Sequence, residues 1–263
     1  MAFTLTLTDH SPLFNEVELT IPDEDVLAEN IGFLLLGHQR HVQSILASKG
    51  RSDPSSTDLM IDDAQAKLVY ATPEERYKRD GWIFQLMTWI ALRQQNLKSN
   101  FFCQIPHDAA AQHGIDGLGV RLTSQNRLEA LVIAEDKYTE NPRRTIKKFV
   151  WPDFEAFEKG THDAQLVNRT TGLIDHLNDD EIDDLIENDI YQLKFRHYKA
   201  GITPEATHMS AAGKKRLFKK FDNCVKGSDH LRRIGVTFYQ ADIRSWMDDF
   251  CEKISDFLET QRP

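Results

Sequence analysis

Hydrophobic and polar residues alternate along two short stretches near the start of the chain, residues 3–8 and 16–21. Alternation with a period of two is the pattern of a half-exposed β-strand, so we predict a strand at each place. After Pro22 the apolar residues recur at helical spacing, which predicts a helix that ends near Gly50. Residues 51–57 contain proline and several serines and are predicted to form a loop.

The next helix has the clearest start in the chain. Thr72 is followed by Pro73 and, three residues after the threonine, by Glu75. This order places a capping residue, a proline in the first turn and a capping-box acid at the positions where helices favour them. Apolar residues then recur at helical spacing to about Gln95, so we predict a helix over 73–95.

Three strand-like stretches follow in quick succession, and helices dominate the rest. Because only a short turn at 124–127 separates the second stretch from the third, we expect these two to pair as an antiparallel hairpin. Such a mixture of strands and helices predicts an α/β fold with a mixed sheet. The strands are expected at 101–105, 114–122, 128–134 and 234–239, and the helices after Asn141 (interrupted at Trp151-Pro152), at 179–192, from Ser210 to about Val225, and at 243–260.

Composition places the chain among ordinary globular proteins. It has 263 residues, of which 40% are hydrophobic and 28% charged, enough for one large domain with its own core. No apolar run reaches the roughly 18 residues that span a bilayer. The three cysteines are far apart and form neither a disulfide framework nor a zinc pair. With no signal peptide in view, we expect a cytoplasmic protein that has no membrane partner.

The most informative residues lie on the central pair of predicted strands. Glu135 and Lys137 end an apolar strand, and because they are two residues apart they share one of its faces. Asp116 stands between glycines on the preceding strand. Neighbouring strands lie about 4.8 Å apart, so the two carboxylates can share one metal ion.

Two carboxylates beside an ammonium have a chemical use. Asp116 and Glu135 can hold Mg²⁺ or Mn²⁺, and such an ion lowers the pKa of a bound water and stabilises charge on a phosphate. Lys137 can orient the attacking water or stabilise the transition state, which together predicts hydrolysis of a phosphodiester. The structural alternative is a salt bridge at the strand end, which would join Glu135 or Asp136 to Arg143 or Arg144.

The net charge is −9, unusual for a protein that binds nucleic acid by itself. Acidic residues are concentrated in the segment 175–189, either as a solvated helix or as a docking surface. Basic residues form two clusters: the first is Arg143, Arg144, Lys147 and Lys148, and the second consists of the basic residues of 214–233. Each cluster either binds phosphates of nucleic acid or forms a solvated helix face.

The helix at 73–95, Asp116, the pair Glu135 and Lys137, and the helix after Asn141 resemble, in this order, the PD-(D/E)xK nuclease superfamily. The resemblance implies a restriction-endonuclease-like core over 73–263, a mixed central sheet flanked by helices, with 1–72 as a mainly helical extension packed on it. The proline of the family motif is replaced by Ile115. Some members place an acidic or amide residue of the first helix near the metal; Gln85 either has this position or lies on the surface.

In finer detail, the order of parts is similar to that in nuclease subunits of bacterial anti-phage systems, particularly the Hachiman type. This resemblance implies a DNA-cleaving endonuclease subunit that works beside a helicase or another ATPase. The chain has no P-loop of its own, so such a partner would have to supply any ATP-driven step. The alternative is a non-catalytic adaptor or regulatory subunit on a nuclease-like fold.

Overall fold

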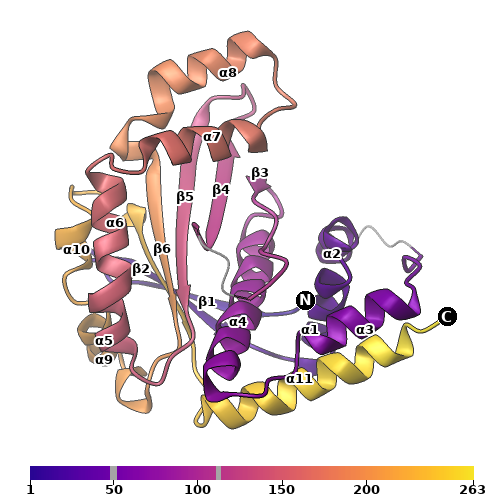
Figure 1. The fold of residues 1–263 in the computed structure, drawn as a ribbon. Coiled ribbons are helices and arrows are strands. Elements are labelled where there is room, and N and C mark those ends of the chain that lie inside the picture. The colour runs from indigo at the N-terminus through magenta and orange to yellow at the C-terminus, as the bar shows by residue number, and fades with distance from the viewer. Residues whose placement is uncertain (48–51, 111–113) are drawn as a thin grey trace.

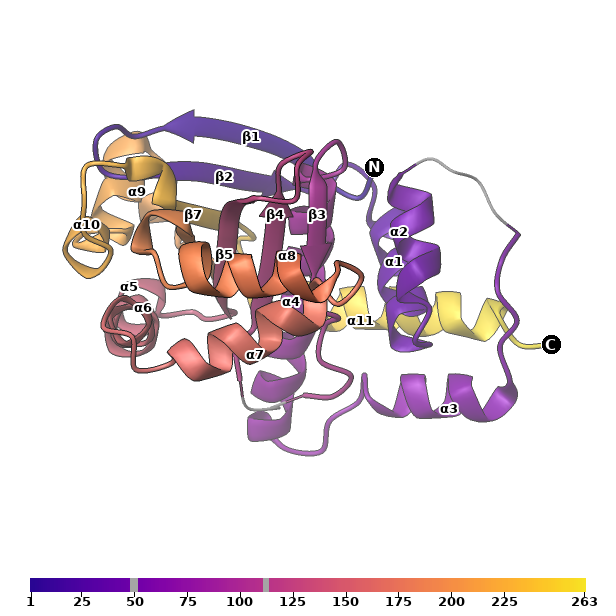
Figure 2. The same ribbon diagram turned by 90° about the horizontal axis from the view of Figure 1, so that it is seen from above.

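In the part of the chain that the structure describes, seven strands form one mixed sheet in the order β1-β2-β7-β6-β5-β4-β3 (Figures 1 and 2). The computed structural model describes residues 1–47, 52–110 and 114–263. The four central strands are parallel to one another, whereas β1 and the β3–β4 pair run antiparallel to their neighbours. This confirms the α/β class and the mixed sheet. The strands are β1 (Thr4–Asp9), β2 (Asn15–Thr20), β3 (Asn100–Cys103), β4 (Gly117–Leu122), β5 (Leu128–Lys137), β6 (Arg196–Ile202) and β7 (Arg233–Phe238).

Helices cover both faces of the sheet (Figures 1 and 2). The first face carries α1 (Glu24–Leu35), α2 (Gln39–Leu46), α3 (Asp58–Ala66), α4 (Pro73–Gln95) and α11 (Ile243–Thr260). The second carries α5 (Pro142–Thr145), the π-helical segment η1 (Ile146–Val150), α6 (Trp151–Glu158), α7 (Asp163–Leu173), α8 (Asp179–Leu185), α9 (Ala211–Leu217) and α10 (Phe221–Cys224).

The sheet therefore separates two large hydrophobic cores, and alternate residues of one strand face opposite sides of the sheet. On β5, Leu131 and Ile133 belong to the core beneath α6, whereas Val132, on the other face, forms a small separate cluster with Leu92 of α4 and Phe101 of β3. The same alternation brings Glu135 and Lys137 to the face of Ile133, as the sequence predicts.

Local signals in the sequence agree with several helices. Helix α4 begins with the predicted capping box, in which the hydroxyl of Thr72 accepts from the Glu75 N–H. The single helix predicted from Pro22 onward is wrong, because two helices meet at Gly37, whose φ of +78° is left-handed and ends the first helix. The predicted end near Gly50 lies outside the described residues.

Other differences concern elements with weaker patterns. The expected basic helix from Ser210 is divided into α9 and α10 at Lys220, which has a φ of +75°. At Trp151-Pro152 the helix changes from π to α geometry, and the acidic helix likewise passes into a π-helical segment (Ile186–Ile190). Strand β6 and helices α3 and α7 are not predicted from the sequence.

Residues on both sides of position 72 build this sheet. Strand β2 pairs in parallel with β7, and α1 packs along α11. Outside residues 48–51, the first 72 residues contain three helices beside their two strands. A domain boundary at residue 72 stays a prediction. Within the described part of the chain, no helix is both long and apolar enough to cross a membrane.

Candidate functional site

The β4–β5 hairpin brings the three predicted site residues together. Gly117 is paired with Ala134 in an antiparallel register, so Asp116, one residue earlier, lies opposite Glu135. Strand β3 ends at Cys103, which pairs with Gly119, and therefore leaves the Asp116 end of β4 open to helix α4.

One ammonium group joins the two carboxylates. Lys137 Nζ lies 2.8 Å from Asp116 Oδ2 and 2.9 Å from Glu135 Oε2. The backbone N–H of Asp136 also donates to Asp116 Oδ2, at 2.9 Å. The two carboxylates thus face a common point at which a positive charge is held, and this is the geometry expected for a shared cation.

Gln85 of α4 belongs to this cluster. Its Nε2 donates to Asp116 Oδ1 at 2.7 Å, so the amide holds the second oxygen of that carboxylate. Gln85 is half-buried and lies beside Asp116, so a surface position is wrong, whereas a place near a metal ion stays a prediction.

Burial gives the cluster its electrostatic character. Glu135 is only 5% exposed. Desolvation, followed by the charge of Asp116, raises the pKa of Glu135 to about 8, although Lys137 acts in the opposite direction. The two carboxylates raise the pKa of Lys137 above its usual range, against desolvation. Ionisation of both Asp116 and Glu135 is therefore unfavourable when Lys137 is the only positive charge beside them, and a further cation would favour it.

The residues fit a hard divalent cation. Mg²⁺ is commonly held by only one or two carboxylates and completes its shell with water and substrate phosphates. Asp116 and Glu135 supply such a pair. Among the described residues, no group of three or more His, Cys, Asp or Glu is placed to hold a metal. Asp116 and Glu135 are the two carboxylates that this cluster brings together.

Asp153 of α6 is a neighbour that sequence reasoning missed. Desolvation raises its pKa, Lys137 and His162 lower it, and Asp116 raises it. Asp153 therefore lies within electrostatic range of the cluster. It stands in the first turn of a helix, where acids are common, so its sequence position gave no signal.

Asp136 has a separate environment on the other face of β5. Its Oδ1 lies 3.0 Å from Lys199 Nζ, and its Oδ2 accepts from the Thr88 hydroxyl at 2.7 Å. Gly201 on β6 leaves room for this carboxylate, since a Cβ there would lie 1.9 Å from Asp136 Oδ1. The salt bridges proposed as the structural alternative are wrong, because Glu135 pairs with Lys137 and Asp136 with Lys199.

The first basic cluster is partly exposed. Arg144, Lys147 and Lys148 are exposed, whereas the half-buried Arg143 donates from Nη1 to the carbonyl oxygen of Leu217 at 3.1 Å. Trp151 Nε1 donates to the carbonyl oxygen of Lys219 at 3.3 Å, so the end of α9 lies beside this helix. Exposed cations of the second cluster therefore adjoin the first; they are Lys215, Arg216, Lys219 and Lys220.

Three other cations of the second cluster have structural roles. Lys214 is buried and binds Glu16, Glu18 and Thr237. Arg232 and Arg233 are buried as well, and both donate to backbone carbonyl groups. These three side chains hold the end of the sheet together and are not available to nucleic acid.

Part of the acidic segment is tied to the β4–β5 turn. Arg127 pairs with Asp184 and, at 3.2 Å, with Asp189, while Asn126 donates to Glu181 at 3.0 Å. The exposed acids that remain are Asp175, Asp179, Asp180, Asp183 and Glu187. The solvated helix is therefore smaller than the sequence suggests.

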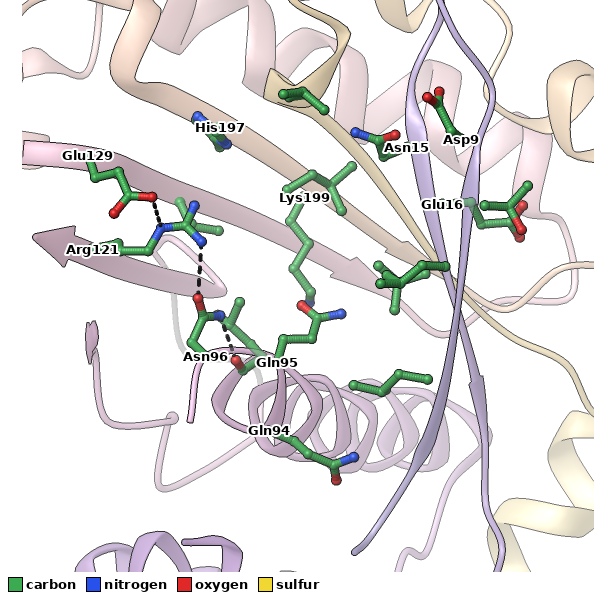
Figure 3. A pocket seen from close by; sticks show the side chains of 18 of the residues that line it. Asp9, Asn15, Glu16, Gln94, Gln95, Asn96, Arg121, Glu129, His197 and Lys199 are labelled. Atoms are coloured by element: carbon green, nitrogen blue, oxygen red, sulfur yellow. Dashed lines mark hydrogen bonds and ion pairs between the residues drawn. The ribbon is translucent and has the colours of Figure 1, made fainter. Parts of the chain in front are cut away.

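Two cavities adjoin the strands that carry the site. One, of about 410 Å³, lies between α4 and η1 and includes Lys137 and Gln85 in its wall. The other, of about 820 Å³, lies over the sheet beyond the end of α4 (Figure 3). In its wall Arg121 lies 3.4 Å from Glu129 and donates to Asn96 at 3.3 Å, so these polar groups pair with one another.

Comparisons with protein-family models, with curated proteins and with solved structures gave no match.

Proposed function

We propose that the chain is a metal-dependent nuclease of the PD-(D/E)xK type, with Asp116, Glu135 and Lys137 at its centre. The observation that carries this proposal is the single ammonium nitrogen 2.8 Å from Asp116 Oδ2 and 2.9 Å from Glu135 Oε2. A buried carboxylate, Glu135, and a half-buried one, Asp116, meet across a hairpin and face one cationic point, an arrangement well suited to hold Mg²⁺ or Mn²⁺.

Each residue has a distinct task in this proposal. Asp116 and Glu135 hold the ion, which when bound would lower the pKa of a water and stabilise charge on the phosphate. Lys137 presents its donors to the same point, where the ammonium can orient the attacking water or stabilise negative charge. Gln85 fixes the orientation of Asp116 through its hydrogen bond of 2.7 Å.

The proposed substrate is DNA, cut as an endonuclease, and the proposed setting is a bacterial anti-phage system with a helicase or ATPase partner. The exposed cations of α5, η1 and α9 support a nucleic-acid surface beside the site. The net charge of −9 supports a partner that delivers the enzyme to its substrate.

Cleavage of supercoiled plasmid and of a single-stranded oligonucleotide, with Mg²⁺ or Mn²⁺, tests the proposal. We expect Glu135→Gln and Lys137→Met each to lower the rate by about 100-fold or more, the usual scale for losing a group that stabilises the transition state. The matched control is Glu129→Gln, which removes an exposed carboxylate from the same strand. Cleavage by both site variants at the wild-type rate would show that the assignment is wrong.

A further inference from the structure

The cavity of about 410 Å³ opens directly beside Lys137. One wall is helix α4, and the other is formed by the end of β5 and the residues that follow it through η1. The carboxylate of Asp136, in the wall of this cavity, is neutralised by Lys199, whose Nζ lies 3.0 Å from Asp136 Oδ1. The side chains around it are Tyr77, Lys78, Trp82, Gln85, Asp136, Lys137, Tyr138, Thr139, Thr145 and Phe149, with Gly81 between them.

Gly81 lines this cavity from helix α4. It stands in the interior of α4, a helix of 23 residues, where glycine is among the least favourable residues. An added Cβ at this position would meet no heavy atom within 4 Å. Packing therefore does not require a glycine here, and a larger side chain would project into the cavity.

Two exposed aromatic rings stand at the cavity. Tyr77 is 54% exposed and Phe149 is 47% exposed. Each ring already has a cation nearby: the Arg244 Cζ atom is 4.2 Å from the ring centre of Tyr77, and Lys148 Nζ is 4.9 Å from that of Phe149. Exposed aromatic rings stack unpaired bases, and exposed cations bind the phosphates that join them. Lys148 is such an exposed cation, whereas Arg244 is buried and paired with Asp80 and Glu140.

We propose that this cavity binds an unpaired base of the nucleic acid, next to the phosphate at the catalytic centre. This inference rests on the proposed function and adds the class of substrate. A base in a duplex is stacked and paired, and it cannot enter a side cavity without first leaving the stack. The preferred substrate is therefore a single strand or an unwound segment.

The experiment measures binding, independent of catalysis. Fluorescence anisotropy in EDTA compares a labelled single-stranded oligonucleotide with a duplex hairpin, using wild type, Gly81→Leu and Phe149→Ser. We expect both variants to weaken binding of the single strand about tenfold, in line with the contribution of one stacked base, and to change duplex binding less than about twofold. The control is Gly172→Leu, since Gly172 in α7 also has no heavy atom within 4 Å of an added Cβ.

The outcomes separate the two proposals. Single-strand binding by folded Gly81→Leu and by Phe149→Ser at wild-type affinity would overturn the cavity inference, as would equal weakening of both substrates. Circular dichroism confirms folding, and Phe149→Ser, at an exposed position, tests the same claim if Gly81→Leu fails to fold. Loss of single-strand binding in a protein that cleaves nothing with Mg²⁺ or Mn²⁺ would support the cavity and contradict the nuclease.

Discussion

Glu135 and Asp136 are adjacent in the sequence, yet their side chains lie in different environments. Glu135 shares a buried position with Asp116 and has its pKa raised to about 8, so its charge is poorly compensated by protein groups alone. Each carboxylate oxygen of Asp136 has a partner, the Lys199 ammonium at 3.0 Å and the Thr88 hydroxyl at 2.7 Å. The first arrangement suits binding of a further cation, whereas the second stabilises the fold.

This contrast predicts opposite effects of substitution on stability. Asp136→Ala leaves the buried ammonium of Lys199 unpaired and should lower the free energy of unfolding by about 3–5 kcal/mol. Glu135→Gln removes a carboxylate whose charge is disfavoured, so it should leave metal-free stability unchanged or raise it. Urea denaturation at pH 8 measures both. Equal destabilisation by the two substitutions would contradict the separation of roles.

His197 on β6 predicts how stability depends on pH. Burial, and then the charge of Arg121, lower the pKa of His197 to about 4. In the folded protein the His197 imidazole stays neutral down to about pH 4, whereas in the unfolded chain, where its pKa is near 6.5, it takes up a proton. The free energy of unfolding therefore falls as pH drops from about 6.5 towards 4. The expected loss is about 1–2 kcal/mol at pH 5, and His197→Gln should remove it. Urea denaturation at pH 7 and pH 5 measures this difference; the same pH dependence in both proteins would contradict it.

At the scale of elements, local patterns predict much of the fold. The capping box at Thr72 and the alternation along β5 are interactions between near neighbours, and they place α4 and the strand that carries the site. The pairing of Asp116 with Glu135 follows from a short hairpin connection and could also be predicted.

What the sequence did not predict depends on contacts between distant residues. Strand β6 carries Arg196 and Lys199, charges that argue against a buried strand until their partners, Asp163 and Asp136, are known. The contact of Gln85 with Asp116 likewise depends on how α4 packs against the sheet. Lys220 divides a predicted helix with a φ of +75°, a conformation that few residues other than glycine adopt and that its sequence does not signal.

The exposed cations of α5 and η1 predict how duplex binding responds to salt. Each phosphate contact on duplex DNA contributes about −0.9 to the slope of log affinity against log salt concentration. Changing Arg144, Lys147 and Lys148 to Gln should therefore reduce the slope by up to about 2.7. Anisotropy titrations at several salt concentrations measure it. The control is the double variant Lys67→Gln with Lys253→Gln, which changes two lysines on the opposite face of the sheet. An unchanged slope in the triple variant would show that DNA binds at another surface.

For the whole molecule, the distribution of charge matters more than its sum. The net charge is −9, yet exposed cations adjoin the proposed site and the exposed acids of α8 lie at another end of the sheet (Figure 1). Such a molecule should bind DNA weakly by itself, and restraint of this kind protects the genome of a host from its own nuclease.

We therefore predict a partner that controls cleavage. The protein should co-purify from its native operon with a helicase or another ATPase, and this complex should stay inactive until the partner engages DNA. Asp179, Asp180 and Asp183 are the exposed acids to change to Asn, because Asp184 already pairs with Arg127. Their neutralisation should loosen the complex or raise background cutting. A protein that elutes alone and cuts plasmid rapidly with Mg²⁺ would contradict this prediction.

Thermal unfolding with and without divalent cation tests the central claim most directly, because it needs no substrate and no partner. If Asp116 and Glu135 hold the ion, millimolar Mg²⁺ or Mn²⁺ should raise the melting temperature of the wild-type protein, and Glu135→Gln should abolish this gain while Glu129→Gln keeps it. A non-catalytic adaptor should show no gain at all. An equal gain in the wild type and in Glu135→Gln, or no gain in either, would contradict the assignment of this site as a metal centre.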